Sequence, residues 1–257
     1  DSDRTIPMLP EVLSNDLCSL RPNEDKFAFS AVFEMDEDAN VIKEWFGRTV
    51  IHSDRRFAYE DAQVRLETGE GDLADELALM FKLATKLRER RFENGGIDFN
   101  TEEVRFELDE SGKPLRVVIK RMRESNKLIE DFMLLANVRV ARFLAKVHPE
   151  KKKPTRTSIY RVHDNPNPEK LQALRVFVRR FGHEMPKPQK DNAESLIRDL
   201  LKATAGTPEE GTVKTMAIRS MAKAEYSSTN IGHYGLSFPY YTHFTSPIRR
   251  YPAVLVH

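Results

Sequence analysis

The sequence predicts an α+β fold in which two antiparallel hairpins and several amphipathic helices form one domain. Apolar residues alternate on both sides of a polar turn in two places, and elsewhere they recur at three- and four-residue steps. The order of these patterns lacks the regular strand–helix alternation of a doubly wound parallel sheet. With 257 residues, 40% of them hydrophobic, the chain can form a substantial core. We expect a single domain because we find no repeat, low-complexity tract or convincing linker.

The first hairpin is predicted over residues 26–35 and 41–52. Alternating apolar side chains in the first segment are typical of a half-buried strand, and the polar residues 36–40 favour a turn. The same reasoning predicts a second hairpin, with strands over 104–108 and 115–120.

Between the hairpins, the spacing of apolar residues predicts a long amphipathic helix over 73–87 that ends before Gly95. A more apolar helix is predicted over 128–144, with Ser125 as its N-cap. Because apolar residues cover most of its sides, we expect this helix near the centre of the core. The remaining predicted elements are a short strand at 158–162 and helices at about 168–181, 191–204 and 208–225.

Three polar residues form a narrow stripe on the apolar helix for which Ser125 is the predicted N-cap. Asn126, Glu130 and Asn137 lie on one face of it by their spacing. Two interpretations remain open from the pattern: the stripe is the solvent face of the helix, or it is a polar wall that lines a buried site.

The charge balance limits where a polyanion would bind. The chain has 41 Lys+Arg and 40 Asp+Glu, a formal net charge of +1, which argues against an outer surface built to hold nucleic acid. The basic run 151–156 is interpreted as solvated surface. The single cysteine, Cys18, has apolar neighbours and is predicted to be a buried structural thiol in a reducing, cytoplasmic compartment. No apolar run is long enough to span a membrane.

The segment from His233 to Tyr251 is the most unusual part of the chain, with four of its seven tyrosines. Ser246 followed by proline predicts a helix that begins there, with Arg249 and Arg250 in its first turn. Cations oppose the helix dipole at that position, so we infer either a bound phosphate or carboxylate or ion pairs with Asp/Glu from elsewhere in the fold. Aromatic residues interleaved with arginine also suit single-stranded nucleic acid. The familiar metalloprotease, phosphate-loop, dinucleotide and serine-hydrolase motifs do not occur.

The same segment resembles the signature of the RNB family of exoribonucleases, ribonuclease II and ribonuclease R, and is most similar to bacterial ribonuclease R. The match runs from His233-Tyr234-Gly235-Leu236 through Thr245-Ser246-Pro247-Ile248-Arg249-Arg250-Tyr251 and ends at His257. Further matches, spread over nearly all of the chain, are residues 6–10, 13–20, 96–99, 128–137 and 160–164.

The resemblance implies a processive, Mg²⁺-dependent 3′→5′ exoribonuclease that threads single-stranded RNA into a channel and releases nucleoside 5′-monophosphates. It implies an RNB-type domain, incomplete at both ends, with a mixed or antiparallel sheet and surrounding helices, and a protein that is expected to be monomeric. By position, Arg249 matches the arginine at the scissile phosphate, Phe99 an aromatic residue that stacks on bases, and Tyr59 with Glu130 the pair that contacts ribose hydroxyls. The other residues expected to contact RNA are Tyr241, Ser246 and Arg250.

Two departures from the family pattern weaken the expectation of activity. The family's DxxxxxDxDD cluster, which holds the metal, belongs upstream of residues 6–10 and is absent. We therefore expect the Mg²⁺ ligands upstream of this chain, which we interpret as an excerpt of a longer protein. The excerpt is expected to be inactive alone, and it lacks the flanking cold-shock and S1 domains of the family. Ala253 stands where the family usually has aspartate. The alternatives are a non-catalytic RNA-binding module of the same fold, or a folding or assembly piece without activity of its own.

Overall fold

The computed structural model describes residues 6–97, 103–109, 111–120, 122–146, 158–189 and 192–257. Contacts divide the chain into two compact units. Unit 1 comprises residues 1–89, 100–146 and 243–257, and unit 2 comprises residues 90–99 and 147–242. The described residues form two-stranded antiparallel sheets and helices, so the α+β prediction is confirmed. Within them, no helix has both the length and the hydropathy needed to cross a bilayer.

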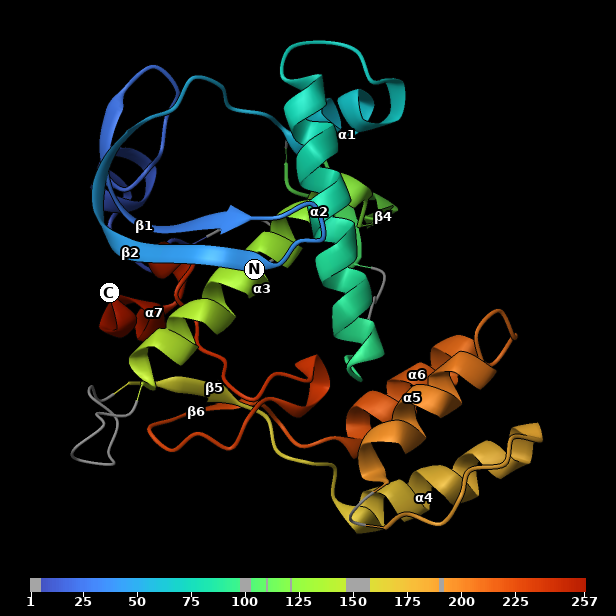
Figure 1. The fold of residues 1–257 in the computed structure, drawn as a ribbon. Helices are drawn as coiled ribbons and strands as arrows, with labels where there is room; N and C mark the ends of the chain where they lie inside the picture. Colours follow the sequence, from blue (N-terminus) through green and yellow to red (C-terminus); the bar gives the residue numbers. More distant parts are fainter. Residues whose placement is uncertain (1–5, 98–102, 110, 121, 147–157, 190–191) are drawn as a thin grey trace. The chain divides into compact units, whose positions relative to one another are not determined.

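The first hairpin of unit 1 consists of β1 (Asp25–Met35) and β2 (Val41–His52), as predicted (Figure 1). The strands are antiparallel, with Ala31 opposite Phe46. The Asp36 carboxylate fixes the turn, because one of its oxygens accepts the backbone N–H groups of residues 38 and 40 at 3.0 and 2.8 Å.

The second hairpin pairs β3 (Glu103–Leu108) with β4 (Pro114–Lys120), which also confirms the prediction. Its turn is closed in the same way, since the Asp109 carboxylate accepts the N–H groups of Ser111 and Lys113 at 2.9 and 3.0 Å. In both turns, therefore, an aspartate carboxylate accepts the backbone N–H groups of the turn.

Two long helices of the chain were predicted, α2 (Ala74–Glu93) and α3 (Glu124–Leu144). A π-helical segment, Val12–Leu17, and α1 (Tyr59–Thr68) were not. In α1 the buried residues are Ala62 and Gln63, and its ten residues give too short an apolar pattern to stand out in the sequence.

The predicted start of α3 was wrong. Its N-cap is Arg123, and Ser125 lies inside the first turn, buried, with its Oγ donating to the carbonyl of Tyr59 at 2.9 Å. A serine at this position bonds another helix instead of capping its own.

The core of unit 1 lies between α3 and the first hairpin (Figure 1). Ala136, Val140 and Leu144 of α3 form a cluster with the buried ring of Phe244. Side chains of both strands pack against this cluster: Phe29, Ala31, Phe33 and Phe46. The expectation that this apolar helix lies near the centre of the core is therefore confirmed within unit 1.

In the described residues of unit 2, the helices α4 (Pro168–Val178), α5 (Ala193–Ala203) and α6 (Glu210–Ser220) surround a hydrophobic core of their own (Figure 1). A small sheet pairs β5 (Tyr160–Val162) with β6 (Glu225–Ser227). The predicted last helix was too long at its C-terminal end, because the chain becomes extended at residue 221 and then pairs as β6.

Cys18 was predicted to be buried, but it is a free and exposed cysteine, because its apolar neighbours Leu17 and Leu20 are themselves exposed. The basic run 151–156 lies outside the described residues.

Candidate functional site

The structure places most of the predicted site residues in unit 1. These are Tyr59, Glu130, Ser246, Arg249 and Arg250. Tyr241 belongs to unit 2, and Phe99 lies outside the described residues.

Tyr59 and Glu130 are carried by two helices that contact each other. Tyr59 is the first residue of α1 and is 46% exposed, and Glu130 is a half-buried residue of α3. Across the described part of the chain, neither the phenol of Tyr59 nor the carboxylate of Glu130 has a hydrogen bond or an ion pair. Both polar ends are therefore available to a ligand.

The three residues of the polar stripe on α3 differ in their surroundings. Asn126 completes the capping box of the helix by accepting the backbone N–H of Arg123 at 3.0 Å. Asn137 is 1% exposed, so the solvent-face interpretation is wrong for it. Glu130 and Asn137 are seven residues apart and share a face of α3, separated by about 10 Å along its axis.

Asn137 holds the C-terminal segment in place. Its Oδ1 accepts the backbone N–H groups of Phe244 and Thr245 at 2.9 and 3.0 Å, and the hydroxyl of Thr245 at 3.3 Å. These bonds fix the backbone directly before Ser246. A buried amide in a helix thus connects the stripe to the family signature.

The helix predicted to begin at Ser246 starts later. Ser246 has a left-handed backbone, φ 62°, which is uncommon for a residue with a side chain, and its hydroxyl does not cap. A 3₁₀ turn follows over Pro247–Arg249, Arg250 is extended, and α7 comprises Tyr251–Val256. The helix-dipole argument for an anion therefore fails, because the arginines precede the helix.

Arg249 ends the 3₁₀ turn with its side chain exposed. It makes no ion pair with any residue that the structure describes, so the alternative of Asp/Glu partners is not realised there. A guanidinium with unused donors, presented by a fixed turn, is suited to phosphate. Arg250 is half-buried, and Ala253 is fully buried in α7, where the apolar side chain needs no polar partner.

In unit 2, Tyr241 is buried and has a packing role. Its ring lies 5.3 Å from the ring of His233 and 5.8 Å from that of Phe238, and its carbonyl accepts the N–H of Arg161 at 2.9 Å. Its contact with RNA stays a prediction.

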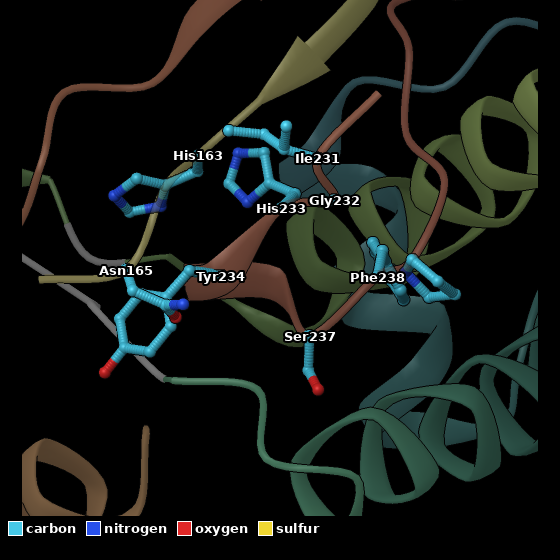
Figure 2. A pocket seen from close by; sticks show the side chains of 9 residues that line it. His163, Asn165, Ile231, Gly232, His233, Tyr234, Ser237 and Phe238 are labelled. Atoms are coloured by element: carbon cyan, nitrogen blue, oxygen red, sulfur yellow. The ribbon is translucent and has the colours of Figure 1, made fainter. Parts of the chain in front are cut away.

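A pocket of about 290 Å³ opens beside this cluster, between the end of β5 and the segment 231–239 (Figure 2). Sequence reasoning did not single out His163, one of its wall residues. The Nδ1 of His163 accepts the N–H of Gly235 at 3.2 Å, so its Nε2 carries the proton that is donated to the carbonyl of Ala222 at 3.0 Å. The ring packs edge-on against those of His233 and Tyr234. The neutral imidazole thus anchors the signature segment to β5.

This anchor predicts a dependence of stability on pH. Burial lowers the pKa of His163, against the opposing effect of its bond to Ala222. In the unfolded chain a histidine takes up a proton below about pH 6.5. Between the lowered pKa of His163 in the folded state and its ordinary pKa in the unfolded state, the unfolded chain binds more protons than the folded one. The free energy of unfolding should therefore fall as the pH drops below about 6.5.

Urea unfolding between pH 7.5 and 5.5 measures this effect. We expect the slope against pH to be smaller in His163→Gln than in the wild type. Equal slopes in the wild type and His163→Gln would contradict the assignment.

The resemblance implies Mg²⁺, an ion that prefers oxygen ligands such as carboxylates. Among the residues that the structure describes, no group of three or more His, Cys, Asp or Glu side chains is placed to hold a metal ion. The described residues therefore do not fit the cofactor.

One protein family covers the residues of both units. A family model for the RNB domain matches residues 2–257. The chain belongs to the RNB family. It is 37% identical to ribonuclease R of Aquifex aeolicus over 262 aligned residues, and the alignment covers 99% of this chain and 36% of that protein. It is 38% identical over 264 residues to the exosome complex exonuclease RRP44 of Homo sapiens, covering 99% of this chain and 27% of that protein.

A solved RNB structure agrees with the fold. RNase R of Mycoplasma genitalium in complex with ribose methylated single-stranded RNA superposes with a TM-score of 0.86 at 29% identity, over 98% of this chain and 39% of that chain. The chain spans about a third of the length of the relatives that it matches.

Proposed function

We propose that the whole protein is a 3′→5′ exoribonuclease that degrades single-stranded RNA to nucleoside 5′-monophosphates. The observation that carries this proposal is the RNB match over residues 2–257, together with ribonuclease R relatives at 35–37% identity. Arg249 supports it as well, because it makes no ion pair within the described residues and ends a turn that a buried asparagine fixes. A local cation of this kind is consistent with a net charge of only +1.

In the proposed reaction, the oxygen of water bonds to the phosphorus that links the last two nucleotides. The bond from phosphorus to the 3′ oxygen of the penultimate nucleotide breaks, and that oxygen takes a proton to become the new 3′ end. Negative charge on the phosphoryl oxygens increases in the transition state, and the guanidinium of Arg249 would offset it. Tyr59 and Glu130 would contact ribose hydroxyls, by which a protein distinguishes RNA from DNA.

The metal belongs to this proposal as well. We propose Mg²⁺ as the cofactor, with carboxylate ligands upstream of this chain, because oxygen donors suit this ion. We also propose a monomeric protein of the reducing cytoplasm, which is consistent with the single exposed thiol of Cys18.

Shortening of 5′-labelled poly(A) by the whole protein tests the proposal. We expect mononucleotides as the product with Mg²⁺ and no product with EDTA. RNA that is bound in a salt-sensitive manner but never shortened, at any Mg²⁺ concentration, would contradict the proposal and favour the non-catalytic RNA-binding module. If the folded protein does not bind RNA at all, the result would favour the third alternative, a folding or assembly piece without activity of its own.

A further inference from the structure

A buried pair of polar side chains joins the first turns of α1 and α3. Gln63 is 7% exposed and Ser125 is 3% exposed. The backbone N–H of Ser125 donates to Oε1 of Gln63 at 3.0 Å, and the Oγ of Ser125 donates to the carbonyl oxygen of Tyr59 at 2.9 Å. We call Gln63 and Ser125 the α1–α3 clamp.

The clamp adds directional bonds to a helix that has little buried apolar surface. Ala62 and Gln63 are the residues of α1 that are buried, so hydrophobic packing alone does not fix its position. Its N-cap, Ala58, has no side chain that can cap. Hydrogen bonds are directional, so the two bonds from Ser125 define both the height and the rotation of the first turn of α1.

The other side of the clamp is held firmly. Asp131 of α3 is buried and accepts a bond from Nε of Arg88 at 2.8 Å, while Asn137 holds the C-terminal segment. The orientation of α3 is therefore fixed by contacts independent of the clamp. Glu130 lies five residues beyond Ser125, about 7.5 Å further along the axis.

We propose that Ser125 and Gln63 are positioning residues that set the preference for ribose over deoxyribose, because they fix Tyr59 relative to Glu130. This inference rests on the proposed function, in which those two side chains contact ribose hydroxyls. Recognition of a single hydroxyl needs its partners held to within about 0.5 Å. The polar ends of Tyr59 and Glu130 are unpaired within the described residues, so only the helix backbones define where they can be placed.

The alternative role of the clamp is structural support alone. Loss of either side chain would then lower stability without changing how the protein treats individual sugars. A ratio of rates on two sugars within one RNA separates the two roles, since reduced stability or a smaller active fraction affects both rates equally.

The experiment uses the whole protein and a 5′-labelled oligo(A) that contains one internal 2′-deoxyadenosine. The rate of removal of adenosine divided by that of the deoxynucleotide is measured under single-turnover conditions. We expect Ser125→Ala and Gln63→Met to lower this ratio by about two- to tenfold, the effect of one hydrogen bond. Ser125→Thr, which keeps the hydroxyl, should restore it.

Asn126→Ala is the matched control. Asn126 is in the same turn of α3 but bonds only to the backbone of Arg123 among the contacts described for it, so its loss should leave the ratio within about twofold of the wild type. Wild-type ratios in both Ser125→Ala and Gln63→Met would overturn the inference. If Ser125→Ala does not fold, Gln63→Met, which retains the Ser125–Tyr59 bond, decides by the same ratio.

Tyr59→Phe separates failure of the inference from failure of the proposed function. A wild-type protein that leaves the RNA intact contradicts the proposed function. An active wild type whose ratio falls in Tyr59→Phe but not in the clamp variants overturns the inference alone. An active wild type whose ratio is unchanged in Tyr59→Phe overturns both the inference and the ribose-contact role.

Discussion

Replacement of Arg249 by alanine in the whole protein is expected to slow single-turnover shortening of RNA by about 10²–10³-fold, the usual effect of removing one donor to a developing oxyanion. RNA affinity should change by less than about threefold, because many other contacts hold a threaded strand. The physical reason is that the exposed guanidinium has no ion-pair partner in the described part of the chain and so keeps its donors for the substrate.

Two further variants test the origin of this effect. Arg249→Lys retains a charge but lacks the bidentate fork, and should recover only part of the rate. Arg180→Ala removes another exposed arginine, in unit 2, and should leave the rate unchanged. Equal losses of turnover and affinity in Arg249→Ala would show that the residue binds RNA without acting in the chemical step.

The hairpins and the long helices were predictable because their signals are local. Alternation in residues 26–35 and the Asp36 turn are sufficient to define β1 and β2, and the apolar repeat of residues 73–87 defines α2. The pattern locates these elements without guaranteeing burial of every apolar residue in them, since Phe27 of β1 is 90% exposed.

The elements that position the site were less predictable because their determinants lie far away in the sequence. The backbone of Ser246 is left-handed, although Ser-Pro alone favours a capped helix, and Asn137 bonds to the residues directly before it. Similarly, α1 is held by Ser125, which is 66 residues beyond Tyr59. The exposed thiol of Cys18 shows the same limit, because apolar neighbours do not guarantee burial.

Replacement of Asn137 by alanine is expected to lower the free energy of unfolding by about 2–5 kcal/mol. The substitution leaves the backbone N–H groups of Phe244 and Thr245 without their acceptor, and each buried unpaired donor costs about 1–3 kcal/mol. Urea unfolding measures the loss. Asn126→Ala, an asparagine on the same helix that completes only a capping box, should cost about 1 kcal/mol. A similar cost for both variants would contradict the anchoring role.

The same substitution tests whether Asn137 acts through Arg249. If the asparagine supports catalysis by fixing the turn that presents the guanidinium, Asn137→Ala should slow turnover in the wild type and have little further effect in the Arg249→Ala background. Asn137→Asp keeps an acceptor for both N–H groups and should recover most of the rate. Independent, multiplicative losses in the double variant would instead mean that the asparagine stabilises unit 1 without setting the position of the arginine.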